Sequence, residues 1–167
     1  MVSGRQLQLT KQIGEYLVAS ELCRRNYIAT TFTGNVPDYD IIASSAKGFH
    51  VAVQVKTIRK PNWQFDMRDF ADIQFNSGKQ TLKRAKRSPL SKLILVLLLL
   101  DEYGKDKFYI MEWKDLRANL IPRYKQYLKK HNGRRPKKPD SYHTSVSPLE
   151  VSMYDGNWKL FKSILRT

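Results

Sequence analysis

One alternating segment decides the fold, and it reads His50-Val51-Ala52-Val53-Gln54-Val55-Lys56-Thr57. Successive side chains of a β-strand point to opposite faces of a sheet, so the three valines share one face. We expect this face to be buried under a helix. Gln54 and Lys56 then point together to the other side. The segment is therefore predicted to be a strand with one apolar face and one face that carries an amide and an amine.

An acidic residue lies at the start of a second strand, predicted at Tyr39–Ser44. The aliphatic run of this strand is typical of a buried position, and the stretch Gly34-Asn35-Val36-Pro37-Asp38 before it is a turn signal. The two strands are placed to pair as a hairpin. The carboxylate of Asp40 is then expected within reach of Gln54 and Lys56.

A second acid lies in a predicted helix. Apolar residues recur at helical spacing over Leu7–Arg24, and Asn26 is suited to end the helix because Asn tolerates left-handed geometry. Glu15 occupies the middle of this helix beside Gly14, which lets a backbone or a ligand approach closely. Two acids, an amide and a lysine suit phosphodiester hydrolysis, because oxygen ligands hold a divalent metal that activates water and a lysine stabilises developing charge.

The composition points to a polyanionic partner. The 167 residues include 30 Lys and Arg against 15 Asp and Glu, a net charge of +15 that attracts phosphates whatever the fold. An apolar fraction of 41% excludes a wholly disordered basic tail, and a single cysteine, Cys23, excludes a disulfide scaffold or a multi-cysteine zinc site. The sequence has neither a membrane-spanning apolar run nor a signal-peptide stretch, so we expect a cytoplasmic protein without a membrane partner.

Two stretches concentrate the positive charge and contain no acid, one within Lys79–Lys92 and the other within Arg123–Lys138. We expect them to clamp phosphates, which gives affinity rather than sequence choice. The residues predicted to contact DNA are Lys79, Lys83, Arg84, Lys86, Arg87, Arg123, Lys125, Lys129, Lys130, Arg134, Arg135, Lys137 and Lys138.

The remaining patterns complete an α/β order. A helix, three strands and then further strands and helices indicate an α/β domain around a mixed sheet. The further elements are a strand at Tyr27–Thr33, a short basic helix at Lys79–Lys86, a strand pair at Leu93–Leu100 and Lys107–Met111, a helix over Trp113–His131 interrupted or restarted at Pro122, a loop or arm over Asn132–Pro148 and a helix at Asp155–Leu165.

The order of the polar residues resembles the PD-(D/E)XK nuclease superfamily. The likeness rests on Glu15, the segment Val36-Pro37-Asp38-Tyr39-Asp40-Ile41-Ile42-Ala43 and Gln54-Val55-Lys56, and covers about Leu7–Thr57. It is greatest to the branch of archaeal Holliday-junction resolvases and small stand-alone homing endonucleases. The intervals between acid, acid, amide and lysine are 25, 14 and 2 residues, and both order and spacing fit that branch.

The resemblance implies a restriction-endonuclease-like mixed β-sheet flanked by helices, with a nuclease core in residues 1–112 and a helical, basic extension in residues 113–167 packed on it. It implies an endonuclease that depends on Mg²⁺, or on Mn²⁺ as an alternative ion, and hydrolyses duplex or branched DNA. Its catalytic residues would be Asp40 as the main metal ligand, Gln54 as a neutral ligand, Glu15 as an auxiliary ligand and Lys56 as the catalytic lysine. Cutting two strands needs two sites, so we expect a homodimer or a dimer of dimers.

The sequence also departs from the family pattern. Gln54 stands where the family carries an acid, and it brings no charge to a metal. Asp38 is the literal PD aspartate, but it falls in the turn, and Asp40 beside the aliphatic run is favoured. Taken alone, Lys56 is also typical of an ordinary lysine on an edge strand. Glu15 is also typical of a solvated residue on a helix. Homing and junction-resolving activity both stay open. Two other classes also stay open, namely a non-catalytic DNA- or RNA-binding module that retains a nuclease fold and a basic RNA-binding or ribosome-associated protein.

Overall fold

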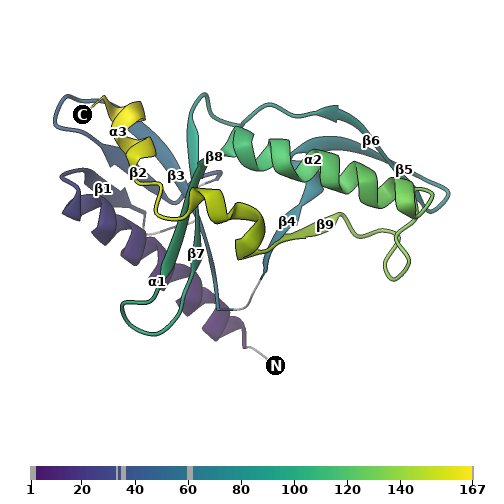
Figure 1. Ribbon diagram of the computed structural model, residues 1–167, viewed down its shortest axis with the longest axis horizontal. Coiled ribbons are helices and arrows are strands. Elements are labelled where there is room, and N and C mark those ends of the chain that lie inside the picture. The colour runs from purple at the N-terminus through teal and green to yellow at the C-terminus, as the bar shows by residue number, and fades with distance from the viewer. Residues whose placement is uncertain (1–2, 33, 35–36, 60–61, 167) are drawn as a thin grey trace. The chain divides into compact units, whose positions relative to one another are not determined.

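The main sheet of the protein has five strands, in the order β1-β2-β3-β7-β8. It is seen in a computed structural model that describes residues 3–32, 34, 37–59 and 62–166. β3 and β7 pair in parallel and the other neighbours pair antiparallel, so the sheet is mixed. The strands are β1 Ile28–Thr31, β2 Ile41–Ser44, β3 His50–Ile58, β7 Leu93–Leu99 and β8 Lys107–Glu112 (Figure 1).

β3 contains the alternating segment His50–Thr57. Its three valines are buried in one core together with aliphatic side chains of β2, β7 and β8. Gln54 and Lys56 lie at the alternate positions of β3, on its other face, and their side chains are half-buried. The predicted strand and its two faces are therefore confirmed.

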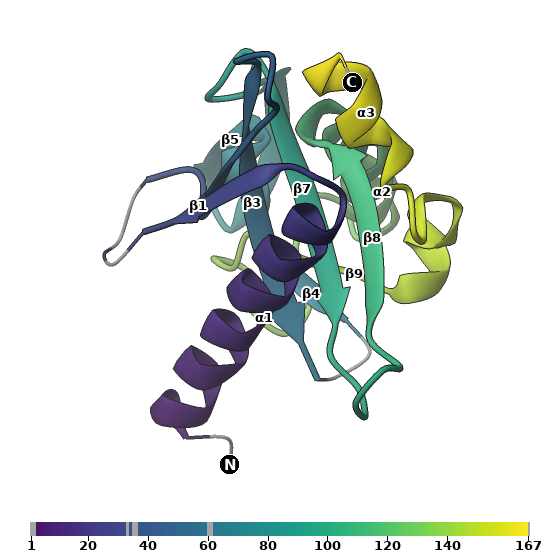
Figure 2. The ribbon, with the colours of Figure 1, turned by 90° about the vertical axis from the view of Figure 1, so that its left-hand side faces the viewer.

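Two helices cover the valine face of this sheet. Val18 and Leu22 of α1 (Gly4–Arg24) and Phe161 and Leu165 of α3 (Lys159–Leu165) belong to the same buried core as the valines of β3. Figure 2 shows α1 running across the sheet in front of β3 and β7. The predicted fold class, an α/β arrangement with a mixed sheet flanked by helices, is confirmed.

Local capping sets both ends of α1. The N–H of Gln6 donates to the Ser3 hydroxyl while the Gln6 side-chain oxygen accepts from the N–H of Ser3. This capping box begins the helix at Gly4, earlier than the predicted Leu7. Asn26 follows the helix with a φ of 62°, the left-handed conformation expected of it.

The chain divides into two compact units. The sheet unit comprises Met1–Trp63, Pro89–Trp113 and Ser147–Thr167, and the basic unit comprises Gln64–Ser88 and Lys114–Val146. The sheet unit holds the five strands, α1, α3 and the 3-10 segment η2 Pro148–Tyr154. The basic unit holds η1 Met67–Asp69, the hairpin of β5 Ala71–Asn76 and β6 Lys79–Ala85, and β9 His143–Val146. It also holds β4 Trp63–Asp66, which pairs with β9, and α2 Trp113–Lys130, each except for its first residue. The boundary predicted at residue 112 stays a prediction.

The short basic helix predicted at Lys79–Lys86 is wrong, because this segment forms β6. Ser77 and Gly78 before it have φ values of 48° and 76°, the two positive values that a two-residue hairpin turn requires. Gln80 is 2% exposed whereas its two neighbours are exposed, which is the alternation of a strand. The turn and the inward Gln80 outweigh the helical propensity of the lysines and arginines.

α2 also differs from the prediction. It runs without a break from Trp113 to Lys130 with Pro122 inside it, where an interruption or restart was predicted. Leu116, Leu120, Tyr124 and Leu128 recur every fourth residue and are buried. The burial of this stripe maintains the helix although proline removes one backbone hydrogen bond.

Other boundaries shift by smaller amounts. The loop predicted over residues 132–148 contains β9, and the last helix begins at Lys159 instead of Asp155. The strands predicted at Tyr39–Ser44, Leu93–Leu100 and Lys107–Met111 are confirmed as β2, β7 and β8. The strand predicted over Tyr27–Thr33 is confirmed as β1, but Thr33 lies outside the described residues, as do Asn35 and Val36 of the following turn. Among the described residues, none of the helices combines the length and the apolar character needed to cross a membrane.

Candidate active site

Asp40 is held against β3 by two hydrogen bonds, one on either side of Gln54. Its backbone N–H donates to the Val53 carbonyl oxygen over 2.9 Å, and its Oδ2 accepts from the Val55 N–H over 2.8 Å. The side chain is only 15% exposed. The charge-assisted bond from a strand amide therefore fixes one carboxylate oxygen and leaves the other for a further partner.

One lysine bridges the two predicted acids. Lys11 Nζ lies 3.6 Å from Glu15 Oε1 and 3.5 Å from Asp40 Oδ1. Lys11 and Glu15 are one helical turn apart on α1, whereas Asp40 immediately precedes β2. The helix acid and the strand acid thus converge on a single positive charge.

The close approach of α1 to β3 depends on Gly14. A Cβ atom added there would lie 1.7 Å from Thr57 Oγ1, so a larger residue would force the helix away from the strand. Glu15 is the next residue, and the contact brings its carboxyl towards Asp40. Burial and the negative charge of Asp40 raise the pKa of the Glu15 carboxyl, and Lys11 opposes that rise.

Gln54 and Lys56 complete the predicted set on β3. The bonds of Asp40 to the residues before and after Gln54 place the acid beside this amide. Lys56 follows at the next position on the same face, and its carbonyl oxygen accepts a 2.9 Å bond from Trp63 Nε1, which anchors the strand there. The structure thus brings Glu15 to Asp40 and Asp40 to Gln54, with Lys56 two residues further along β3.

The oxygen donors at this site are few. Asp38, the alternative aspartate, is exposed in a turn with a φ of 72°. Within the part of the chain that the structure describes, no three His, Cys, Asp or Glu side chains gather into a metal-binding group. A cation at Glu15 and Asp40 would therefore draw on two carboxylates.

The residues predicted to contact DNA all lie in the basic unit. This unit holds 16 Lys and Arg against 5 Asp and Glu, whereas the sheet unit holds 14 against 10. The basic unit therefore carries most of the net charge. Its thirteen predicted residues are Lys79, Lys83, Arg84, Lys86, Arg87, Arg123, Lys125, Lys129, Lys130, Arg134, Arg135, Lys137 and Lys138.

Sequence reasoning missed Lys11. A lysine four residues before a glutamate on a helix is a common surface ion pair, and this spacing was the available signal. Its second partner, Asp40, depends on how α1 packs on the sheet, which spacing alone does not give.

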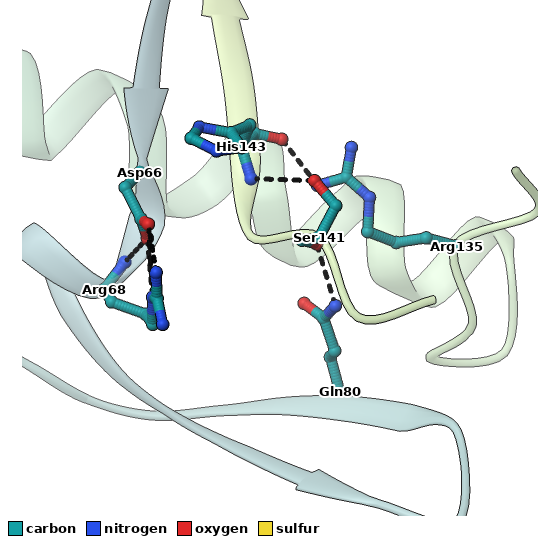
Figure 3. A network of polar contacts seen from close by, with 6 residues as sticks. All are labelled: Asp66, Arg68, Gln80, Arg135, Ser141 and His143. Atoms are coloured by element: carbon teal, nitrogen blue, oxygen red, sulfur yellow. Dashed lines mark hydrogen bonds and ion pairs between the residues drawn. The ribbon is translucent and has the colours of Figure 1, made fainter. Parts of the chain in front are cut away.

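Sequence reasoning also missed the role of Gln80 in the basic unit. Its Nε2 donates to the carbonyl oxygens of Pro139 and Ser141, over 2.6 and 2.9 Å, and its Oε1 accepts from the Tyr124 hydroxyl. Figure 3 shows the bond to Ser141. A buried amide needs all its partners, so Gln80 ties β6 and α2 to the segment of residues 131–142. No local pattern in the sequence pointed to this role, because the partners of Gln80 lie 44 to 61 positions away.

Comparison with known proteins gives one structural likeness. No protein-family model matches the sequence, and no curated protein matches it. The structure is similar to that of a bacterial homing endonuclease, I-Ssp6803I, with 12% sequence identity and a TM-score of 0.49. The likeness covers 95% of this chain and 93% of that chain. Because the TM-score is below 0.5, the functional proposal rests on the side chains described above.

Proposed function

We propose that the protein is a metal-dependent endonuclease that hydrolyses phosphodiester bonds of DNA. The observation that carries this proposal is the convergence of Glu15 and Asp40 on one cation, Lys11 Nζ, with Asp40 hydrogen-bonded to the N–H of Val55, the residue between Gln54 and Lys56 on β3. A nucleic acid substrate is supported by the excess of 16 basic over 5 acidic residues in the basic unit.

The donor set fits a hard divalent cation. Asp40, Glu15 and the Gln54 amide would hold Mg²⁺, or Mn²⁺ as an alternative ion, through oxygen atoms. The raised pKa of Glu15 reflects burial beside a second negative charge, a cost that bound positive charge relieves. When bound, such an ion polarises a phosphate oxygen and lowers the pKa of a coordinated water.

Each residue then has a distinct role in the proposed reaction. Asp40, fixed by the Val55 N–H, and Glu15 supply the negative charge, and Gln54 adds an oxygen without charge. Lys56 stabilises the negative charge that develops on the scissile phosphate. Lys11 is a positioning residue, because its ammonium holds the two carboxylates together.

Two specific observations favour a second candidate, a non-catalytic nucleic-acid-binding protein with the same fold. Gln54 lacks the charge of an acid, and Lys11 already provides a cation between the two carboxylates. In this case the ion pairs would serve to hold α1 against β2. Binding to nucleic acid would then be the same with and without a divalent metal.

A cleavage assay separates the two candidates. Wild type, Asp40→Ala, Lys56→Ala and Gln54→Glu are each given supercoiled plasmid and a four-way DNA junction, with Mg²⁺, Mn²⁺ or chelator. The enzyme should nick or cut only with metal, and Lys56→Ala should lower the rate by about 100-fold or more. The preferred substrate then distinguishes junction resolution from duplex cleavage.

Two results would favour the binding protein. The first is intact DNA under every condition together with an unchanged gel shift. The second is activity that appears only in Gln54→Glu, which would make Gln54 a disabling change on an otherwise suitable site. Because both strands of a duplex require two sites, the proposal includes a homodimer, and sedimentation of the active species tests that part.

A further inference from the structure

The basic unit contains a pocket that the proposed hydrolysis does not use. It encloses about 580 Å³ and is lined by residues of α2, β4, β9 and the segment before β9. Three of the lining side chains are basic, namely Arg123, Lys130 and Arg135, and two are the aromatic rings of Tyr124 and Tyr127. None of the lining residues, all of them within the described ranges, is an Asp or Glu. The pocket therefore favours an anion.

Neutral groups orient the guanidinium of Arg135. Its Nη1 donates to the carbonyl oxygen of His143, as Figure 3 shows, and its Cζ lies 5.5 Å from the ring centroid of Tyr127 and 6.0 Å from that of Tyr124. The carbonyl oxygen and the two aromatic rings hold the planar guanidinium in place without neutralising its charge. These contacts, together with an interaction of Arg135 with the Tyr124 hydroxyl, hold the guanidinium in a fixed geometry.

The backbone around the pocket is itself held in place. Gln80 binds the carbonyl oxygens of Pro139 and Ser141, and its backbone N–H donates to the Gly133 carbonyl oxygen over 2.8 Å. Arg123 Nη2 donates to the Ser145 carbonyl oxygen of β9 over 3.2 Å. The segment that carries Arg135 is therefore tied at both ends, which lowers the entropy lost when an anion binds.

We propose that this pocket binds one phosphate group of a nucleic acid, with Lys130 and Arg135 as its principal ligands. A planar guanidinium suits two phosphate oxygens, and an ammonium adds a point charge. The ring of Tyr127 contacts the rings of Tyr124 and His131 and is 36% exposed, and the exposed part gives the attached base a surface on which to stack. This inference rests on the proposed function, since its ligand is again a nucleic acid, here one with an unpaired base, but it needs no metal and no hydrolysis.

The test is a binding titration in chelator, so that the proposed metal site takes no part. A fluorescent single-stranded oligonucleotide is titrated with wild type, Arg135→Gln, Lys130→Gln and Tyr127→Leu, and anisotropy gives Kd. Each loss of charge should weaken binding about fivefold or more and reduce the slope of log K against log salt by about 0.7, the contribution of one phosphate contact on a single strand. Tyr127→Leu should weaken binding by at least about fivefold with little change in that slope.

Controls separate the pocket from the general field of the basic unit. Lys114→Gln removes one charge from the same helix outside the pocket, and it should change Kd less than twofold. Arg135→Lys keeps the charge but loses the planar guanidinium with its paired donors, so its Kd should fall between those of wild type and Arg135→Gln. Lys130 is exposed, so its substitution tests the pocket even if the Arg135 variants unfold, which circular dichroism reports.

A direct probe is the NMR titration of wild type with inorganic phosphate and, separately, with thymidine 5′-monophosphate. Shifts should concentrate on Arg135 Nε and on residues 143–145, and the nucleotide should also shift Tyr127. Equal effects of Lys130→Gln and Lys114→Gln, or phosphate shifts spread evenly over all basic residues, would overturn the pocket. Failure of cleavage alone would overturn the proposed hydrolysis and leave the pocket intact.

Discussion

The sheet unit and the basic unit arrange their charged side chains in opposite ways. In the sheet unit two acids are brought together at the edge of an apolar core, and a lysine holds them there. In the basic unit, 16 Lys and Arg are spread over a hairpin, a helix and a tied loop with only 5 acids among them. One unit concentrates negative charge at a point, and the other distributes positive charge over a surface.

This difference in charge arrangement predicts which measured property a substitution in each unit should change. A few fixed oxygens can support a reaction on a phosphate, but they repel the polyanion that carries it. Distributed cations overcome that repulsion and supply affinity, yet they provide no group that acts on the scissile bond. Changes in the sheet unit should therefore alter rate or metal response, and changes in the basic unit should alter affinity and its salt dependence.

The largest effect is expected from Asp40→Asn, which removes the charge but keeps an oxygen to accept from the Val55 N–H. The rate of metal-dependent cleavage should fall by at least about 100-fold. Loss of a group that only hydrogen-bonds to a metal ligand lowers metal affinity or activity about 10- to 100-fold, and loss of a ligand should cost more. The Kd for DNA, measured by anisotropy in chelator, should stay within twofold of wild type. A parallel loss of affinity would mean that Asp40 supports the fold rather than the reaction.

The next effect concerns the basic unit. The triple variant Lys83→Gln, Lys137→Gln and Lys138→Gln removes three exposed charges and should weaken DNA binding by roughly 10- to 100-fold near physiological salt. The slope of log K against log salt should fall by about 2 to 3, since each phosphate contact contributes about 0.9.

A matched triple variant in the sheet unit provides the comparison. Lys105→Gln, Lys107→Gln and Lys159→Gln remove the same charge from exposed positions outside the predicted clusters. Their salt slope should change by less than about 1. If the two triple variants weaken binding equally, total charge rather than its location determines affinity, and the contrast between the units has no functional meaning.

Gln80→Leu tests what keeps the basic unit in order. The substitution leaves the Tyr124 hydroxyl and two carbonyl oxygens without the buried amide, at a cost of about 2 kcal/mol. Urea unfolding should show this loss, and amide exchange should accelerate over residues 131–142. Gln74→Leu, at an exposed position on the neighbouring strand, should be close to neutral. Equal stability of the two variants would show that Gln80 is not the anchor.

Sequence patterns predicted the sheet unit better than the basic unit, for a physical reason. The valines of β3 are buried by contacts that repeat every second residue, and this periodicity is visible in the chain itself. In β6 only the first residues alternate in exposure, and the buried one is the polar Gln80, so burial leaves no apolar signal. Its burial is balanced by hydrogen bonds to residues about sixty positions away, which no local pattern contains.

In the candidate site, too, some contacts could be predicted from the sequence and others depend on the tertiary structure. The proximity of Asp40 and Gln54 follows from a hairpin with a short turn, so it could be predicted from spacing. The position of Glu15 depends on the close packing of Gly14 on Thr57, and only the residue type of Gly14 hinted at it. The bridge from Lys11 to Asp40 joins a helix to a strand 29 residues later in the chain, so it needed the tertiary structure.

The smallest effect is expected from Glu15→Gln, measured as stability against pH. The pKa of Glu15 is raised in the folded protein, so the native state binds its proton more tightly than the unfolded state does. Wild type should therefore lose stability relative to the variant as pH rises from the unfolded value, about 4.3, through the higher folded value. Without divalent metal, the Tm of Glu15→Gln should equal or slightly exceed that of wild type at pH 7, and the difference should vanish near pH 3.

Adding Mg²⁺ should reverse that order. A ligand that binds only the folded state stabilises it by mass action, so wild type should gain Tm with metal concentration and Glu15→Gln should gain less. Glu21→Gln is the matched control, because Glu21 lies on the same helix and pairs with Arg24 and Arg25. It should respond to Mg²⁺ as wild type does. If Mg²⁺ raises the Tm of Glu15→Gln as much as that of wild type, Glu15 contributes nothing to a metal site, and its carboxylate serves only to pair with Lys11.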